Sequence, residues 1–325
     1  MTKKVYSAVK LPEETIEILK DANIDLKMFD KLDTPTEDQI LENINDVEGL
    51  ISGVNVTITS KIIEASKELK AIANIGAGVN NIDIEAAREK GILLTNTPGR
   101  NSVASTAETA LGLMLALSRG ILKNQKMVEE NSFPGWQVMG FLGGQQVAYK
   151  NLFIVGFGNI GQEIARMAKG LHMNISYYDI KDRSEFKEAE AETGASFVDF
   201  EEGLKNADYI VLQMNYTEAN HHFIGQEQLK RMKDSAYLIN TARGGIVDEK
   251  ALYQALKAGK LAGAAIDTHE EEPKINEDLL KLDNVVLTPH IGNDTYEARI
   301  EMANTAAKDL IKVLEGQEPQ YLVEA

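Results

Sequence analysis

The sequence predicts an α/β protein of two domains, each a doubly wound parallel sheet covered by helices. Three observations support this prediction. Short apolar segments alternate with amphipathic segments along most of the chain, and a helical stretch near the middle separates one such series from a second. Alternation of strands and helices is typical of parallel sheets. The length of 325 residues also favours two domains, because a single hydrophobic core rarely grows that large.

The first series covers about one hundred residues. Thr36, followed three residues later by Gln39, has the pattern of a capping box at a helix start. Gly91 stands where a helix should end before the next strand. The predicted strands are 5–9, 24–29, 49–54, 71–75 and 92–95, and the predicted helices are 13–22, 38–44, 60–70 and 84–90.

A long helix over 103–130 is predicted next, and the second series follows it. Helices such as 248–258, where Leu252, Ala255 and Leu256 share one face, separate strands at 152–155, 175–178, 209–214, 237–239, 262–266 and 285–287. The last helix, about 294–315, can fold back on either domain. We place this helix with the first series, which gives a discontinuous domain at 1–100 plus 294–325 and a second domain at 101–293.

The strongest local motif is a glycine-rich loop between a strand and a helix, the setting that a dinucleotide-binding loop requires. Gly156 permits a tight turn, Gly158 lets a pyrophosphate approach the backbone, and Gly161 allows close helix–strand packing. The helix N-terminus then offers free N–H groups to the phosphates.

Asp179 ends the next strand and indicates which dinucleotide is bound. Its carboxylate can accept hydrogen bonds from both ribose hydroxyls of NAD and would repel the 2′-phosphate of NADP. The sequence therefore predicts NAD, although Arg183 nearby could accommodate the extra phosphate.

Three strands of the second series end near side chains suited to 2-oxo acid reduction. Such chemistry needs a cation for the substrate carboxylate, an acid/base at the carbonyl oxygen and a group that tunes the acid/base. Arg243, the acids 270–272 and His290 follow consecutive strands. Ligands of open α/β sheets bind outside the carboxyl ends of the strands, so we expect these groups at one edge. His172, His221, His222 and His269 are interpreted as surface or packing histidines.

These segments closely resemble the D-isomer-specific 2-hydroxyacid dehydrogenase family, from about residue 71 to 302. Arg243 and Glu272 are 29 residues apart and Glu272 and His290 are 18 apart, which is the family's spacing and selects Glu272 over Glu270 and Glu271. The chain departs from the family pattern after Leu212, where a histidine and a proline are usual. The motifs that carry the resemblance are Gly76-Ala-Gly-Val-Asn-Asn-Ile-Asp83, Thr95-Asn-Thr-Pro-Gly99, the glycine loop, Asn240-Thr-Ala-Arg-Gly-Gly245, Glu272-Pro273 and Thr288-Pro-His290.

The resemblance implies a flavodoxin-like substrate domain, a Rossmann NAD-binding domain with a cleft between them, and NAD-dependent interconversion of a 2-oxo acid and a D-2-hydroxy acid. Arg243 would hold the substrate carboxylate and carbonyl oxygen, and His290, paired with Glu272, would exchange a proton with that oxygen. Asp267 would accept from the nicotinamide carboxamide. The backbone at Ala77, Gly78 and Val79 would bind the substrate carboxylate, and the further cofactor-binding positions would be Asn159, Ile160, Thr241, Ala242 and Gly292.

The family resemblance also implies an oligomeric state, and residues of the first series indicate the size of the substrate. The family dimerises through the region that corresponds to 103–130, so we expect a homodimer. Asn74, Val79, Asn80 and Asn101 indicate a small, partly polar substrate pocket, which favours glyoxylate or hydroxypyruvate over pyruvate, branched-chain or aromatic oxo acids.

Three alternatives share this fold. Formate dehydrogenase has a glutamine where Glu272 stands, which argues against it. Phosphoglycerate dehydrogenase would require cations near 76–81, and Arg100 is the nearest candidate. An NAD-sensing corepressor-like binding protein could also keep the triad.

Composition excludes several classes of function. The net charge of −16 argues against nucleic-acid binding, which requires Lys and Arg to neutralise phosphates. The chain has no cysteine, which excludes disulfides and thiolate metal sites, and we expect no metal. No apolar run approaches the roughly 20 residues of a membrane helix. The first ten residues lack the apolar region of a signal peptide, so we expect a cytoplasmic protein.

Overall fold

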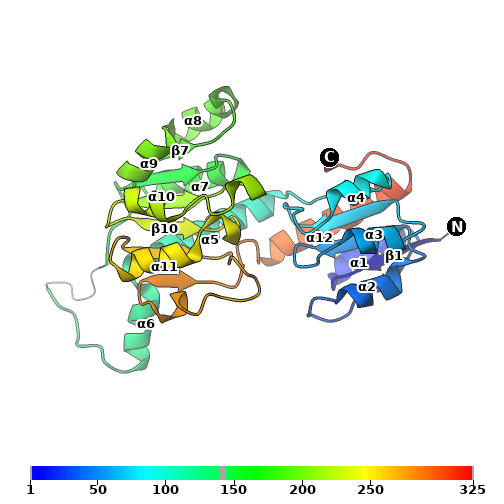
Figure 1. Cartoon of the computed structure of the whole chain (residues 1–325), viewed down its shortest axis with the longest axis horizontal. Coiled ribbons are helices and arrows are strands. Elements are labelled where there is room, and N and C mark those ends of the chain that lie inside the picture. Colours follow the sequence, from blue (N-terminus) through cyan, green and yellow to red (C-terminus); the bar gives the residue numbers. More distant parts are fainter. Residues whose placement is uncertain (1, 139–143, 324–325) are drawn as a thin grey trace. The chain divides into compact units, whose positions relative to one another are not determined.

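The computed structural model describes residues 2–138 and 144–323 and confirms the α/β class with two parallel sheets (Figure 1). The chain forms two compact units, Met1–Ser102 with Thr295–Ala325 and Val103–Asp294, and each is described by itself. In the described residues, no helix combines the length and apolar character that a membrane span requires.

The first unit contains a five-stranded parallel sheet with the order β2-β1-β3-β4-β5, which is the order of flavodoxin-like folds. Helix α12, near the C-terminus, belongs to this unit together with the N-terminal strands. The strands are β1 (Lys3–Ser7), β2 (Ile24–Met28), β3 (Gly49–Gly53), β4 (Ala71–Ile75) and β5 (Leu93–Thr95), and the helices are α1 (Glu13–Asp21), α2 (Glu37–Ile44), α3 (Ser60–Ala65), α4 (Ile84–Glu89) and α12 (Tyr296–Leu314).

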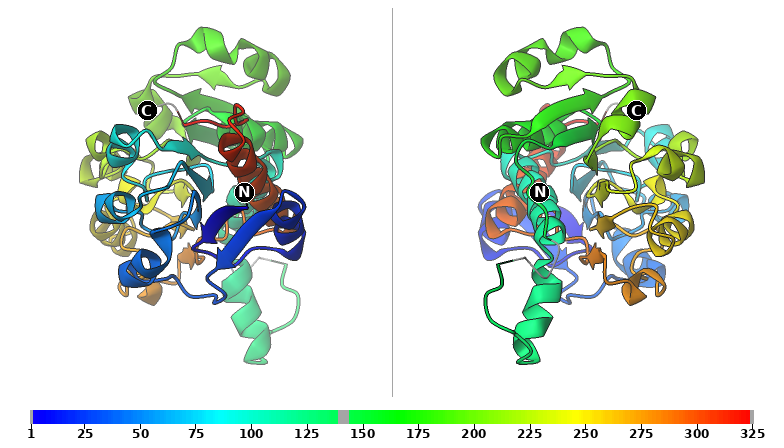
Figure 2. Two further views of the ribbon diagram at one scale, coloured as in Figure 1. Left: turned by 90° about the vertical axis from the view of Figure 1, so that its right-hand side faces the viewer. Right: turned by 90° about the vertical axis from the view of Figure 1, so that its left-hand side faces the viewer.

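Helices cover both faces of the first sheet (Figure 2). Strand residues such as Tyr6 and Leu50 pack against α2, α3 and α4, whereas their neighbours Val5 and Ile51 pack against α1 and α12. Successive strand residues point to opposite faces, so a sheet that is covered on both sides needs continuously apolar strands. The predicted capping box of Thr36 at the start of α2 is confirmed.

The second unit contains a seven-stranded parallel sheet with the order β12-β11-β10-β9-β6-β7-β8. The order reverses between β6 and β9, and Rossmann folds bind dinucleotides at this reversal. The strands are β6 (Asn151–Val155), β7 (Asn174–Tyr178), β8 (Ser196–Phe197), β9 (Tyr209–Leu212), β10 (Tyr237–Asn240), β11 (Gly263–Ile266) and β12 (Val285–Leu287). The helices are α5 (Arg100–Arg119), α6 (Ile121–Glu129), α7 (Asn159–Gly170), α8 (Lys187–Thr193), α9 (Phe200–Asn206), α10 (Gln226–Arg231) and α11 (Glu249–Lys257), with single 3-10 turns η1 (Arg183–Phe186), η2 (Glu218–Asn220), η3 (Gly244–Ile246) and η4 (Leu279–Lys281).

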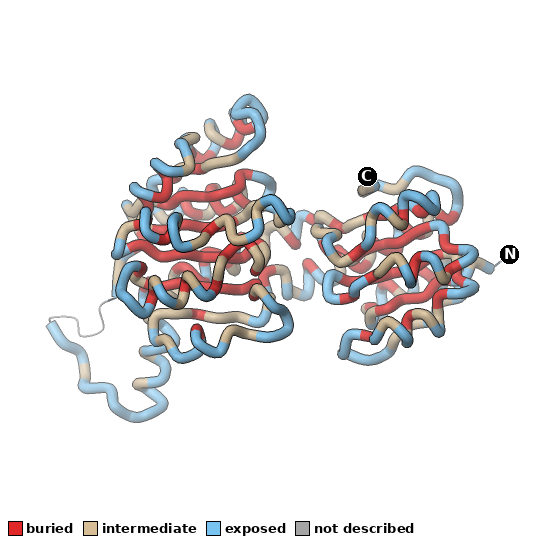
Figure 3. Tube along the Cα trace, in the orientation of Figure 1, coloured by how far each residue is buried: buried red, intermediate tan, exposed pale blue. Residues whose placement is uncertain are grey.

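Two cores also flank the second sheet. Met114 of α5 and Ile164 of α7 are buried on one face, and Leu229 of α10 and Leu252 of α11 on the other. The central strands β6, β9, β10 and β11 are buried along most of their length, while helices such as α7 and α11 alternate between buried and more exposed positions (Figure 3). The rigid sheet thus fixes the loops that follow its strands.

The structure corrects two sequence predictions of secondary structure. The long helix predicted over 103–130 is two helices, α5 and α6, because Gly120 adopts a left-handed conformation with φ of 58°. The helix predicted over 60–70 ends at Ala65, where Ser66 becomes extended.

Candidate active site

The glycine loop connects β6 to α7, and each glycine has its own steric reason. Gly156 has φ of 96°, and a Cβ there would lie 2.5 Å from the Gln213 carbonyl oxygen. A Cβ on Gly161 would lie 2.3 Å from the Gly156 carbonyl oxygen. Around Gly158, in contrast, a Cβ would meet nothing within 4 Å, so the space above its backbone is open. These are the conditions under which a pyrophosphate can approach the chain.

Asp179 follows β7 and lies against the glycine loop. Its Oδ2 accepts a hydrogen bond from the Phe157 backbone N–H at 2.6 Å, and its Oδ1 accepts one from the Lys181 N–H at 2.9 Å. Arg183, the residue that could have favoured NADP, is paired with Glu190 at 2.8 Å. The carboxylate therefore stands at the end of the loop where a ribose would lie.

The turn after β10 is held by Asn240, which is fully buried. Its Oδ1 accepts from the Ala242 N–H at 3.1 Å, and its Nδ2 donates to the Arg243 carbonyl oxygen at 3.0 Å. The Gln213 side chain donates to the Thr241 hydroxyl from the loop that departs from the family pattern. The motif contained Asn240, but sequence reasoning gave it no role.

Arg243 projects from this turn as a partly buried cation. Its Nη1 donates to the Ala242 carbonyl oxygen at 2.7 Å. Burial lowers the pKa of Arg243, and the charge of Glu272 partly opposes that effect. A guanidinium with its other N–H groups pointing away from the turn can receive a planar anion.

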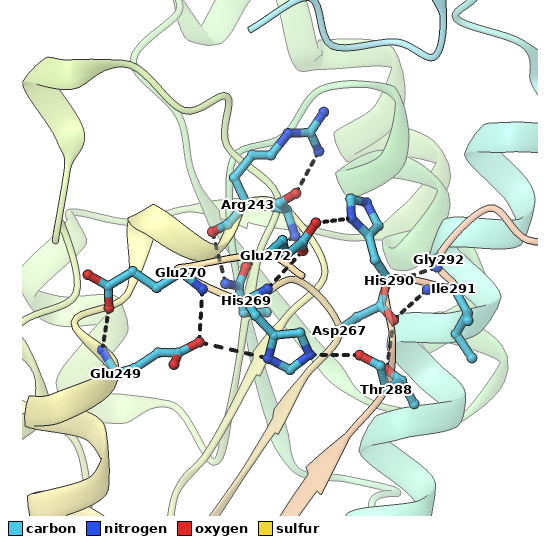
Figure 4. Close-up of polar contacts among 12 residues, drawn as sticks. Arg243, Glu249, Asp267, His269, Glu270, Glu272, Thr288, His290, Ile291 and Gly292 are labelled. Atoms are coloured by element: carbon cyan, nitrogen blue, oxygen red, sulfur yellow. Dashed lines mark hydrogen bonds and ion pairs between the residues drawn. The ribbon is translucent and has the colours of Figure 1, made fainter. Parts of the chain in front are cut away.

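His290 and Glu272 form a pair. His290 Nδ1 lies 2.9 Å from Glu272 Oε2, and the other carboxylate oxygen of Glu272 accepts from the His269 N–H at 2.9 Å (Figure 4). Burial raises the pKa of Glu272, but the hydrogen bond and the charge of His290 outweigh it, so the pKa lies below its ordinary value. The glutamate is therefore ionised near neutral pH and can stabilise a charged imidazole.

Asp267 holds the turn that carries His290. Its Oδ1 accepts from the Thr288 hydroxyl at 2.7 Å and the Ile291 N–H at 2.8 Å, and its Oδ2 accepts from the Gly292 N–H at 2.8 Å. The residue is 0% exposed. Both oxygens thus already serve protein donors, and the expected bond to a nicotinamide carboxamide stays a prediction.

The Arg243 turn packs directly on the loop after β11. A Cβ on Gly244 would lie 1.9 Å from the carbonyl oxygen of His269, so no side chain fits between the two backbones. This close contact, with the Glu272–His290 pair, brings the three sequence-predicted catalytic residues into one region of the second unit (Figure 4).

The described residues include one group of metal-ligating types, His221, His222 and Glu270, with ligand atoms within 4.8 Å of one another. The two imidazole rings are stacked, with centroids 3.8 Å apart and planes 24° apart. Imidazole binds metals along an in-plane lone pair, and two nearly parallel stacked planes do not converge on one ion. His222 Nε2 instead pairs with Glu270 Oε1 at 2.6 Å, and we assign the cluster to loop packing.

In the first unit, the loop after β4 carries Ala77, Gly78 and Val79. Among the described residues, the backbone N–H groups of these three make no hydrogen bond to the protein. Asn74, expected in the substrate pocket, is instead fully buried, and its side chain donates to the Gly78 carbonyl oxygen at 2.8 Å. The asparagine therefore shapes the loop from beneath and does not line a pocket, which corrects the sequence prediction.

Comparison with known proteins gives a consistent result. The family model described as "D-isomer specific 2-hydroxyacid dehydrogenase, NAD binding domain" matches residues 111–292. A Staphylococcus haemolyticus protein named "Putative 2-hydroxyacid dehydrogenase" is 43% identical over 320 residues, which cover 98% of this chain and 99% of that protein.

Two solved structures are similar over nearly the whole chain. A Thermus thermophilus protein is 33% identical with a TM-score of 0.91, over 99% of this chain and 100% of that one. A glyoxylate reductase from Paecilomyces thermophila is 31% identical with a TM-score of 0.88, over 99% of this chain and 98% of that one.

Proposed function

Because the chain belongs to the D-isomer specific 2-hydroxyacid dehydrogenase family, we propose that it reduces a small 2-oxo acid to its D-2-hydroxy acid through Arg243, Glu272 and His290. Membership confirms the resemblance of the motifs and the class of NAD-dependent oxidoreductases. The observation that carries the proposal is the His290–Glu272 pair, with 2.9 Å between Nδ1 and Oε2.

The second unit has the features that NAD requires. The open space above Gly158 and the unpaired N–H groups of the first turn of α7 suit the pyrophosphate, and Asp179 suits the ribose. When bound, NADH supplies the hydride to the substrate carbonyl carbon. The residues proposed to hold it are Gly156, Gly158, Asn159, Ile160, Gly161, Asp179, Thr241, Ala242, Asp267 and Gly292.

His290 is proposed as the acid/base. The charged ring donates through Nδ1 to Glu272, which leaves the Nε2–H for the substrate carbonyl oxygen. As the hydride reaches the carbon, that proton moves to the oxygen, and the reverse reaction returns it to Nε2. Glu272, ionised as described above, accepts the hydrogen bond from Nδ1 and keeps the ring oriented.

Arg243 and the loop after β4 are proposed to hold the substrate. The planar guanidinium can make two parallel hydrogen bonds to a carboxylate and its neighbouring carbonyl oxygen. The free N–H groups of Ala77, Gly78 and Val79 in the first unit can bind a carboxylate. Similarity to a glyoxylate reductase supports a short side chain, so glyoxylate and hydroxypyruvate are the proposed substrates.

The test of this function is NADH oxidation, followed at 340 nm, against glyoxylate, hydroxypyruvate, pyruvate, 2-oxoisocaproate and phenylpyruvate. Turnover with glyoxylate or hydroxypyruvate is expected. Turnover confined to a larger acid would contradict the proposed pocket size. If none of these acids supported NADH oxidation while NADH still bound, the proposed function would be contradicted, and a phosphorylated substrate or a binding protein would be favoured.

Replacement of Asp179 by alanine is expected to weaken NADH binding and to reduce the difference in affinity between NADH and NADPH. The loss of hydrogen bonds from two ribose hydroxyls to a carboxylate corresponds to roughly 100-fold or more in Kd, since hydrogen bonds to charged groups are worth about 1.5–3 kcal/mol each. Fluorescence titration with both cofactors measures this. Lys181→Ala is the matched control, because only its backbone contacts Asp179. An unchanged preference in Asp179→Ala would exclude the ribose role.

We further propose that the protein is a cytoplasmic homodimer that pairs through the helical region 103–130, where α6 carries exposed apolar side chains. Ile121, Leu122 and Val128 of α6 are more than half exposed, and Trp136 is 81% exposed. Exposed apolar side chains gathered in one segment mark association surfaces in soluble proteins. Light scattering should give twice the mass of one chain, and Leu122→Glu with Val128→Glu should give monomers.

A further inference from the structure

His269 lies between the segments that carry the three proposed catalytic side chains. It follows β11 and is 5% exposed. Its backbone N–H donates to Glu272, and its carbonyl oxygen contacts Gly244, next to Arg243. Its ring reaches the segment after β12, where Nε2 lies 2.9 Å from the Thr288 carbonyl oxygen. Sequence reasoning did not distinguish this histidine from the packing histidines.

The hydrogen bond to Thr288 determines the proton on the ring. A carbonyl oxygen can only accept, so Nε2 must carry a hydrogen. On the other side of the ring, Nδ1 has no hydrogen-bond partner and lies 3.8 Å from Glu249 Oε1. The ring therefore contributes one directed bond, from Nε2–H to the chain two residues before His290.

That bond acts where the backbone is strained. His290 adopts a left-handed conformation with φ of 54°, which is unfavourable for a residue with a Cβ. Asp267 restrains the turn from one side, through the His290 N–H to its carbonyl oxygen at 2.9 Å and through its carboxylate. His269 restrains Thr288, which enters the turn.

We propose that His269 is a positioning residue, which fixes Glu272 through its backbone N–H and the His290 turn through its ring, and so sets the geometry of the acid/base pair. The inference rests on the function proposed above. Its consequence is kinetic: a loosened turn should slow proton transfer from His290, while the binding of NADH and of the oxo acid should change little.

Two substitutions isolate the ring's hydrogen bond. His269→Phe keeps the ring's bulk and the backbone N–H but removes the Nε2–H. His269→Gln places an amide N–H near the position of Nε2 and restores a donor. We expect kcat to fall about tenfold in His269→Phe, as loss of one buried hydrogen bond predicts, with both KM values nearly unchanged. The solvent deuterium isotope effect on kcat should rise in His269→Phe, and His269→Gln should recover most of the rate.

A second measurement does not require turnover. The chain has only five histidines, so ¹⁵N-histidine labelling gives a sparse spectrum, and His290→Ala identifies the His290 ring signals. The ring ¹⁵N chemical shifts of His290 should differ from the wild-type values in His269→Phe and equal them in His269→Gln. They should also equal them in the control His172→Phe, because the His172 ring lies on the exposed surface against Tyr149.

The outcomes separate the two proposals. Absence of wild-type turnover would overturn the proposed function, and the ¹⁵N shifts would still decide whether His269 positions His290. Wild-type kcat and unchanged His290 shifts in His269→Phe would overturn the inference. The inference would also be overturned if His269→Phe and His269→Gln lost kcat equally and if these losses paralleled decreases in their thermal unfolding midpoints. That result would indicate a purely structural role.

Discussion

Replacement of His290 by alanine is expected to reduce kcat by roughly 10²- to 10⁴-fold, the usual contribution of a positioned general acid. The ring makes one hydrogen bond through Nδ1 to Glu272 and leaves Nε2 for the substrate. Alanine removes the proton donor but keeps the main-chain bond from residue 290 to the Asp267 carbonyl oxygen, so the turn should persist. The rate of NADH oxidation at saturating oxo acid measures the effect.

NADH binding is the control for this substitution. The glycine loop follows β6 and Asp179 follows β7, whereas His290 follows β12. The Kd for NADH in His290→Ala should therefore stay within about twofold of the wild-type value. His172→Ala, on the surface of the same unit, should leave kcat unchanged. A loss of NADH affinity as large as the loss of kcat would assign His290 to cofactor binding.

The alternation of apolar strands and amphipathic helices was enough to predict the fold class and most strands. It failed where a local conformation depends on packing. A single glycine costs a helix only about 1 kcal/mol, so the sequence around Gly120 does not reveal that α5 and α6 are separate. Strand β8 has two residues, too few to show a period. The position of α12 was ambiguous because only its tertiary contacts, chiefly with α1, β3 and β4, assign it to the first unit.

The candidate site divides in the same way. That Arg243, the acids 270–272 and His290 lie in one region could be predicted because parallel strands deliver their C-terminal ends to one edge, whereas only the family spacing selected Glu272 among the three acids. The side chains that support these residues could not be predicted from the sequence. The roles of Asn240 and His269 depend on where main-chain N–H and carbonyl groups point after a turn, and a sequence does not state those directions. Asn74 illustrates the opposite error, since this polar residue beside a predicted substrate loop is fully buried and its side chain bonds to the Gly78 carbonyl oxygen and to the side chains of Ser52 and Asn81.

Replacement of Arg243 by alanine is expected to lower kcat/KM for the oxo acid by roughly 10²- to 10³-fold. Removal of one partner from a desolvated ion pair usually costs about 3–5 kcal/mol, and a factor of ten corresponds to about 1.4 kcal/mol. Most of the loss should appear in KM if the arginine binds the carboxylate equally in ground and transition states, and in kcat if it acts on the developing oxyanion. NADH affinity should not change.

Lysine at position 243 gives the sharper test. A lysine keeps the charge but not the planar fork, so one of two parallel hydrogen bonds is lost, and the expected reduction in kcat/KM is roughly 10- to 100-fold. Burial lowers the pKa of Arg243, and the same burial should bring a lysine, which starts near 10.4, closer to the assay pH. Activity of Arg243→Lys should therefore fall as pH rises, because the lysine loses its proton and its attraction for the carboxylate, whereas the wild-type arginine stays charged. A variant as active as the wild type at every pH would show that position 243 supplies neither the fork nor the charge.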